Sequence, residues 1–124
     1  MAKRFQETSK AIAYRSGTWR RTSSTGASGG HVRYAKAKGA TASFTFTGRA
    51  VAWVAQVGPG RGAARVYVDG VYRKTVDLHR SSNVARRIVY RISWLAAGKH
   101  TISVRVVGTS GHPRVDVDAF VTIR

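Results

Sequence analysis

Few side chains in this sequence are of a type and spacing that would support catalysis. Only 5 of the 124 residues are Asp or Glu, which leaves few carboxylate pairs for general acid–base work. Asp116 and Asp118 stand two apart on an expected strand and so share a face, but no third group is placed near them. We interpret this pair as a strand end held by salt bridges to nearby arginines. No metal-ligand spacing occurs among the four histidines, His31, His79, His100 and His112.

The glycine-rich segment GPGRG, at residues 58–62, is a loop signal without a phosphate-binding signature. No Lys-Ser or Lys-Thr pair follows it, and the next expected element is a strand instead of a helix. The chain has no cysteine, which excludes disulfides, thiolate nucleophiles and cysteine-bound zinc. We therefore predict that this protein is not an enzyme. The GPGRG loop is the segment that we expect to meet a partner.

A binding function has more support, because basic and aromatic side chains gather on the outward parity of several expected strands. Guanidinium groups bind sulfates, uronates or phosphates, and aromatic rings stack on sugars or bases. We predict a polyanion-binding face made of Arg33, Arg65, Arg73, Arg87, Arg91 and Arg105. The predicted ligand contacts are Trp19, Arg61, Tyr67 and Tyr72. The alternative is a basic sheet face that is simply solvated.

The charge of the chain points to the same class of partner. It carries 22 Lys and Arg against 5 Asp and Glu, a formal net charge of +17, and the basic residues are spread along its whole length. Such a field attracts nucleic acid, acidic polysaccharide, anionic lipid or an acidic protein surface without choosing among them. Coding bias, or adaptation to heat or salt, would produce a similar composition.

The elements that must position these groups are strands. In the stretch 39–78, Phe44 and Phe46 alternate with polar residues, and residues 51–55 are apolar on both parities, as in a central strand. Asp69-Gly70 is a strong hairpin signal. Turns are expected at 47–49 and 95–100. Further strands are expected at 12–14, 31–35, 86–94, 102–107 and 115–123, and no helix is expected.

These patterns predict one all-β domain, an antiparallel jelly-roll β-sandwich of eight or nine strands over residues 11–124. A flexible basic segment is expected over residues 1–10. Residues 15–30 form a surface loop by composition, in which Trp19 is either a plug for the core or an exposed stacking platform. No signal peptide or membrane-spanning run is found. The expected core contains Phe44, Phe46, Trp53, Val66 and Val68.

The order of the motifs resembles a known family. The motifs are YRSGTW at 14–19, GGHVRY at 29–34, GATASFTFTGRAVAWVA at 39–55, GPGRGAARVYVDG at 58–70, LAAGKHTI at 95–102 and VDVDAFVTIR at 115–124. Together they are similar to the β-jelly-roll modules appended to secreted actinobacterial hydrolases and surface proteins. These modules belong to the galactose-binding-domain-like group, which includes many carbohydrate-binding modules. The resemblance covers residues 11–124.

The resemblance implies a jelly roll of eight or nine strands and, for many relatives, glycan binding at loop edges or on the concave face. Related modules often hold a structural calcium, and Glu7 and Asp118 match the positions of its acidic ligands. The acidic N-terminal motif that usually accompanies this calcium is absent, so we predict no cofactor, with calcium as the alternative. The charge of +17 and the lack of an export signal also depart from the relatives.

We predict a non-catalytic module that binds polysaccharide and prefers anionic glycans. Such a module would work outside the cell or at its surface, as part of a larger protein. The alternatives are a structural subunit with an acidic protein partner, such as a virion decoration or tail protein, and a charge-driven nucleic-acid binder. No recognised nucleic-acid-binding motif is present, so nucleic acid ranks last. The sequence does not predict the oligomeric state.

Overall fold

The computed structural model describes residues 2–124 and consists almost entirely of antiparallel strands. The strands are β1 (Ala2–Gln6), β2 (Ile12–Arg15), β3 (Arg20–Ser23), β4 (His31–Ala35), β5 (Thr41–Val57), β6 (Ala63–Val68), β7 (Val71–Asp77), β8 (Val84–Val106), β9 (Val115–Val117) and β10 (Ala119–Ile123). Within residues 2–124 the only helical element is a short 3₁₀ turn, η1 (Ser28–Gly30). The expectation of an all-β antiparallel sandwich is confirmed. No helix in this described part is long and apolar enough to cross a membrane.

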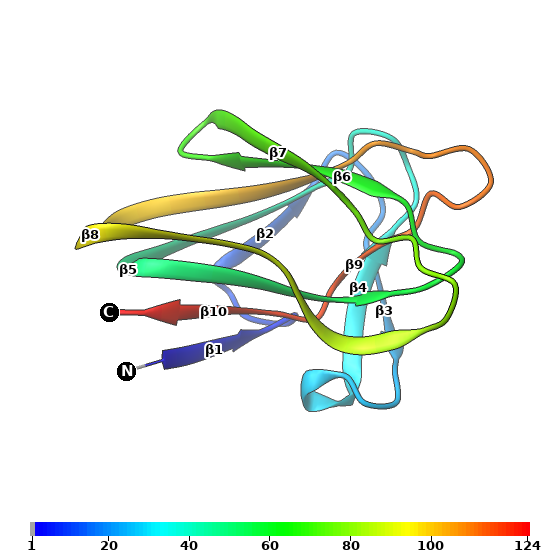
Figure 1. Ribbon diagram of the computed structural model, residues 1–124, viewed down its shortest axis with the longest axis horizontal. Coiled ribbons are helices and arrows are strands. Elements are labelled where there is room, and N and C mark those ends of the chain that lie inside the picture. Colours follow the sequence, from blue (N-terminus) through cyan, green and yellow to red (C-terminus); the bar gives the residue numbers. More distant parts are fainter. Residues whose placement is uncertain (1) are drawn as a thin grey trace.

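The two longest strands, β5 and β8, form a paired ribbon that bends in its middle. Their register runs from Thr41 opposite Arg105 to Gly48 opposite Gly98, and it resumes at Ala50 opposite Ser93. Between these two pairs β5 has one residue, Arg49, and β8 has four, residues 94–97. Figure 1 shows both strands running to one end of the molecule, turning there and coming back. The turns expected at 47–49 and 95–100 are the two bends of this ribbon.

The bend divides the hydrogen-bonded strands into two layers that face each other. The layer built on the first half of β5 has the order β2–β5–β8–β6–β7, and the layer built on its second half has the order β1–β10–β5–β8. Phe44 of the first layer stacks on Phe120 of the second, with ring centroids 4.8 Å apart, and the Phe5 ring of β1 lies 4.9 Å from Phe44. Aromatic packing between the layers thus forms the centre of the core.

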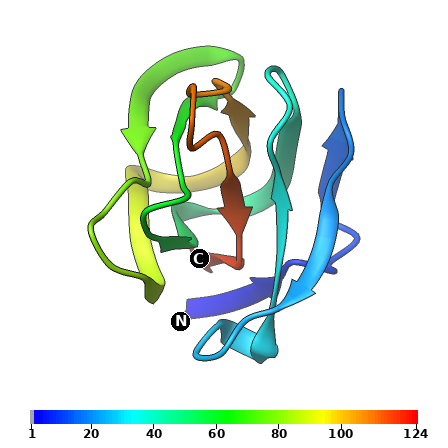
Figure 2. The same cartoon turned by 90° about the vertical axis from the view of Figure 1, so that its right-hand side faces the viewer.

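A third, smaller sheet has the order β3–β4–β9. Figure 2 looks onto this end of the molecule, where β3 and β4 run beside each other. The sheet is joined to the sandwich through Trp53, whose indole Nε1 donates to the carbonyl oxygen of Asp116 at 3.3 Å. All five predicted core residues are buried, so that prediction is confirmed for Phe44, Phe46, Trp53, Val66 and Val68.

The predicted hairpin is also confirmed. Asp69 and Gly70 both have positive φ angles, 52° and 80°, as a two-residue turn between twisted strands requires. β6 and β7 pair on either side of it, with Tyr67 opposite Tyr72.

The structure differs from the expectations in three segments. Residues 2–6, expected to be flexible, form β1 and pair with β10 along their length, because Phe5 enters the core; Met1 lies outside the described residues. Part of the expected loop at 15–30 forms β3, which pairs with β4. The strand expected at 115–123 divides at Asp118, where the chain passes from the third sheet into the sandwich.

Candidate functional site

The outer face of the layer β2–β5–β8–β6–β7 brings several predicted binding residues together. Phe44, Val66 and Ile102 point into the core, so the residues next to them in each strand point outward. Because the strand registers align, the outward residues form rows across the sheet. We call this surface the Arg/Tyr face, and it consists of Arg15, Ser43, Arg65, Tyr67, Tyr72, Ser103 and Arg105.

The first row of the Arg/Tyr face carries three arginines. Arg65 and Arg105 are direct cross-strand partners, and Arg105 is also opposite Thr41, which pairs with Arg15 on its other side. Like charges directly opposite each other destabilise a sheet. Within residues 2–124, no carboxylate forms an ion pair with any of these arginines. The row is therefore a concentrated, unneutralised positive charge that an anionic ligand would relieve.

The next row carries aromatic rings and hydroxyl groups. Tyr67 and Tyr72 face each other across the hairpin with ring centroids 5.8 Å apart and an edge-to-face geometry. Tyr72 is 52% exposed. On the neighbouring strands, the Ser43 and Ser103 hydroxyl oxygens lie 2.8 Å apart and share a hydrogen bond. Aromatic and hydroxyl groups thus stand directly beside the arginine row.

The single carboxylate at the hairpin end of this layer is already engaged. Asp69 accepts a hydrogen bond from His100 Nδ1 at 2.7 Å and another from the backbone N–H of Thr101 at 2.9 Å. These bonds, the one from His100 first, lower the pKa of Asp69 below its ordinary value. Asp69 therefore stays ionised without neutralising the arginine row.

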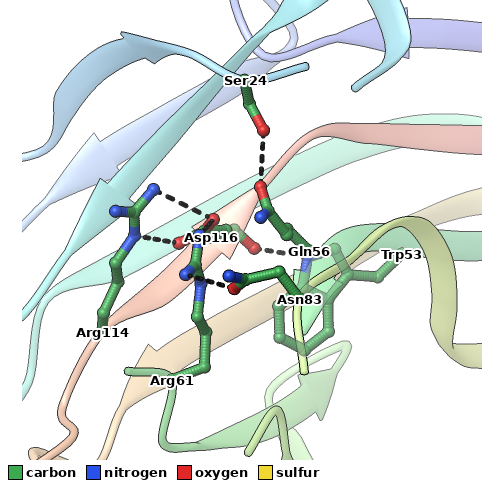
Figure 3. Close-up of polar contacts among 7 residues, drawn as sticks. All are labelled: Ser24, Trp53, Gln56, Arg61, Asn83, Arg114 and Asp116. Atoms are coloured by element: carbon green, nitrogen blue, oxygen red, sulfur yellow. Dashed lines mark hydrogen bonds and ion pairs between the residues drawn. The ribbon is translucent and has the colours of Figure 1, made fainter. Parts of the chain in front are cut away.

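Arg61, the predicted contact in the GPGRG loop, points into the protein (Figure 3). Its Nη2 donates to Asp116 Oδ2 at 2.9 Å, and Arg114 Nε donates to Asp116 Oδ1 at 2.7 Å. Arg61 is only 8% exposed and Asp116 is fully buried. For Asp116, the interpretation as a carboxylate held by local arginines is confirmed. The Arg61 guanidinium is committed to a buried ion pair.

Trp19 and Arg33 lie together near the third sheet, joined by Tyr14. The Trp19 ring is 5.2 Å from the Tyr14 ring, and Arg33 Cζ lies 4.8 Å from the centroid of the same ring. Trp19 is half-buried and packs against the core, which favours its interpretation as a plug. Burial raises the pKa of the Tyr14 hydroxyl, which donates to the Glu7 carbonyl oxygen at 2.7 Å.

The other predicted arginines do not join one patch with the Arg/Tyr face. Arg73 lies on β7 next to Tyr72 and is exposed. Arg87 and Arg91 are exposed on the half of β8 that belongs to the opposite layer, where they pair with Ala55 and Ala52. The predicted polyanion-binding set is therefore divided. Arg65 and Arg105 lie on the Arg/Tyr face, with Arg73 next to that face on β7; the other three are Arg33 beside Tyr14, and Arg87 and Arg91 on the opposite layer.

The two residues that the resemblance assigns to a calcium ion both have protein partners, although, within the described part of the chain, Asp118 Oδ1 is buried without one and the Glu7 charge acts on Asp118. The Glu7 carboxylate pairs with Arg21, Nε to Oε2, at 2.8 Å. Asp118 Oδ2 accepts the backbone N–H of Ser28 at 3.0 Å, and the Arg86 guanidinium is among the charges that act on Asp118. No cluster of three or more His, Cys, Asp or Glu side chains suited to a metal occurs in residues 2–124.

Three members of the Arg/Tyr face were missed in the sequence: Arg15, Ser43 and Ser103. Each occupies an outward position beside a core residue, so strand alternation alone marks them as surface residues. Their place in one cross-strand row depends on which strands pair. That pairing brings β2 and β6 to opposite sides of the central ribbon, and no local pattern encodes it.

No family model matches the chain. It is similar to two curated proteins of Flavonifractor plautii. It is 39% identical over 104 residues to an A type blood N-acetyl-alpha-D-galactosamine deacetylase, a match that covers 84% of this chain and 13% of the relative. It is 32% identical over 111 residues to an A type blood alpha-D-galactosamine galactosaminidase, covering 90% of this chain and 10% of the relative. The chain thus spans a small part of the length of both.

Among solved structures, the chain is similar to the CBM36-1 domain of a multidomain xylanase from the hindgut metagenome of Trinervitermes trinervoides. The TM-score is 0.69 at 12% sequence identity, and the match covers 98% of this chain and 95% of that domain. Similarity over nearly the whole of both chains at this identity reports on the fold. The chain is a β-sandwich of the kind found in carbohydrate-binding modules.

Proposed function

We propose that this chain is a non-catalytic module that binds anionic polysaccharide on its Arg/Tyr face. The observation that carries the proposal is the cross-strand pair of Arg65 and Arg105, which has no carboxylate partner within residues 2–124 and stands beside Tyr67 and Tyr72. A guanidinium group binds a sulfate or carboxylate with two parallel hydrogen bonds. The tyrosine rings and serine hydroxyls of the next row would contact the sugar rings between the charges.

The positions of the carboxylates support a binding role over a catalytic one. Asp69, Asp116 and Glu7 are ion-paired, as described above. Asp118 is buried and accepts the Ser28 N–H, and Asp77 accepts the backbone N–H of His79 at 2.9 Å. All 5 acidic residues of the chain thus have structural partners. None stands beside the Arg/Tyr face as a free acid or base.

The relatives support a glycan as the ligand. Both Flavonifractor plautii proteins are named for galactosamine-containing sugars, and the CBM36-1 domain is part of a xylanase. The matched segments are small parts of both Flavonifractor plautii proteins. We propose that this chain likewise serves a larger glycan-acting protein, and that it works outside the cell or at its surface. The alternatives, a virion subunit and a nucleic-acid binder, gain no comparable support from these relatives.

The proposal is tested by affinity electrophoresis through gels that contain alginate or chondroitin sulfate, with neutral xylan as the comparison. At about 0.15 M salt, exposed charges more than roughly 8 Å apart are screened, so surviving retention reports close contacts. We expect retardation by the acidic polysaccharides. Arg65→Gln with Arg105→Gln should weaken it about tenfold or more, because each charge-assisted hydrogen bond contributes roughly 1.5–3 kcal/mol.

The matched control is Arg87→Gln with Arg91→Gln, which removes the same charge from the opposite layer and should leave retention nearly unchanged. Equal losses from both double variants would show that net charge, not the Arg/Tyr face, carries the binding. Absence of any retention at this salt concentration would refute the proposal.

A further inference from the structure

The opposite layer, β1–β10–β5–β8, carries an apolar groove on its outer face. A hollow of about 460 Å³ lies over β10, β5 and β8. A second hollow of about 220 Å³ adjoins it, because Ile88 and Val121 line both, and we call the two together the groove. Ile88 and Ile123 line the groove and project into solvent, with exposed fractions of 56% and 39%. Large apolar side chains exposed next to a hollow indicate a contact surface.

Small apolar residues form the floor of this groove. In register along the two central strands, Ile123 pairs with Ala50, Val121 with Ala52 and Ala119 with Val54. No aromatic residue lines either hollow. Without a ring to stack on a sugar face, the groove is unsuited to a glycan. The small apolar side chains of its floor favour a ligand with an aliphatic surface instead.

Arginines border the apolar floor on both sides. One cross-strand row reads Arg4, Val121, Ala52, Arg91, with an arginine on each outer strand. Arg86 lines the second hollow. Within residues 2–124, neither Arg4 nor Arg91 forms an ion pair with a carboxylate. The groove thus combines an apolar centre with positive charge along both edges.

The dimensions of this arrangement select the occupant. Neighbouring strands are roughly 4.8 Å apart, so the Cα atoms of Arg4 and Arg91, three strands apart, are separated by about 14 Å. An α-helix with its side chains is about 10–12 Å wide. From Ala50 to Val54 the floor runs about 13 Å, the length of roughly nine helical residues. A single aliphatic chain would leave much of this width to water.

We propose that the groove docks an acidic amphipathic helix of a partner protein. The apolar stripe of the helix would cover the floor, and acidic side chains on its two flanks would meet Arg4 and Arg91. Charge complementarity distinguishes this occupant from a second copy of the chain, since a two-fold contact through the groove would set arginines against arginines. The groove is on the opposite layer from the Arg/Tyr face, so a glycan and a helix can bind together.

The experiment uses the whole chain and a fluorescently labelled helical peptide of about 14 residues. The peptide carries leucines spaced three and four apart along one stripe, glutamates on both flanks, and side-chain lactam bridges that hold it helical. Fluorescence anisotropy at about 0.15 M salt measures its binding. We expect saturable one-to-one binding, weakened roughly tenfold or more by Arg91→Glu and further by Arg4→Glu in the same chain.

Two controls make the result specific. Arg105→Glu makes the same charge change on the Arg/Tyr face and should leave peptide affinity within about twofold. A peptide with lysine in place of glutamate should bind only the chain that carries both Arg4→Glu and Arg91→Glu. This reversal of charge preference would locate the contact at the two edges of the groove.

Other outcomes would overturn the inference. The first is that the glutamate peptide shows no saturable binding up to about 1 mM. The second is that Arg105→Glu and Arg91→Glu weaken peptide affinity equally. The third is that the chain binds phosphatidylserine vesicles through Arg91 but does not bind the peptide. The polysaccharide assay stays independent. If the peptide fails to bind but polysaccharide retention is normal, the groove proposal fails and the proposed function stands. If polysaccharide retention is absent but the peptide binds, the proposed function fails and the groove proposal stands.

Discussion

The buried ion pair of Arg61 with Asp116 gives a sharp prediction about stability. Asp116→Ala removes the carboxylate that both Arg61 and Arg114 contact. The Arg61 side chain is 10% exposed, so its charge would be left buried without a carboxylate, with only the Asn83 side-chain oxygen still accepting a hydrogen bond from Nη1 at 3.4 Å. Breaking a buried ion pair in this way costs about 3–5 kcal/mol. That is a large part of the roughly 5–15 kcal/mol that stabilises a typical domain.

Urea unfolding followed by tryptophan fluorescence measures this cost. Trp53 is a suitable reporter, because its indole donates to the Asp116 backbone carbonyl, which the substitution retains. We expect the free energy of unfolding to fall by about 3–5 kcal/mol. In a thermal scan, a fall of this size corresponds to about 9–25 °C, at roughly 3–5 °C per kcal/mol for a chain of this length.

The control variant removes both members of the pair, Arg61→Met with Asp116→Leu. Replacing a buried pair by apolar residues of similar volume is often neutral or stabilising, so this variant should be clearly more stable than Asp116→Ala. A free energy of unfolding of Asp116→Ala within about 1 kcal/mol of the parent value would contradict the prediction. A double variant with the same free energy of unfolding as Asp116→Ala would contradict it as well.

Two further predictions concern the core and a buried carboxyl group. Phe44→Ala should lower the free energy of unfolding in urea by about 3–5 kcal/mol, because Phe44 is fully buried and stacks on Phe120 between the layers; a loss under about 1 kcal/mol would contradict this packing. Burial raises the pKa of Asp118, so its contribution to stability is present below its unfolded pKa and is lost as pH rises through the folded pKa. Asp118→Asn, whose side-chain oxygen can still accept the Ser28 N–H, should therefore gain stability relative to the parent over the pH range above about 4, where an unfolded aspartate ionises. A difference that stays constant across this range would disprove the assignment.

The sandwich could be predicted from sequence because its signals are local. Phe44 and Phe46 alternate with polar residues on β5, and Asp69-Gly70 supplies the two positive φ angles of the hairpin. β1 was missed because it is short and its outward residues are polar or basic. Phe5 is the one large apolar residue of β1 that marks the side facing the core. A single apolar residue does not establish the alternation that identifies a strand.

The candidate site was harder to predict, because it depends on pairing between distant segments. Arg65 and Arg105 were both assigned to an outward parity, but their position as direct neighbours follows from the pairing of β6 with β8. Arg61 shows the opposite effect. Its glycine-rich loop suggested an exposed contact, yet Asp116, distant in sequence, neutralises it inside the protein. Local composition predicts exposure poorly where a charge has a buried partner.

The place where an anionic glycan contacts the protein can be measured directly. Amide chemical shifts recorded by NMR during titration with a chondroitin sulfate oligosaccharide would locate the contact. We predict that the largest changes occur on β6, on β7 and at residues 101–105 of β8, around Arg65, Tyr67 and Arg105. Changes confined to the loops at 58–62 and 79–83, or spread evenly over the basic residues of both layers, would contradict the Arg/Tyr face as the binding site.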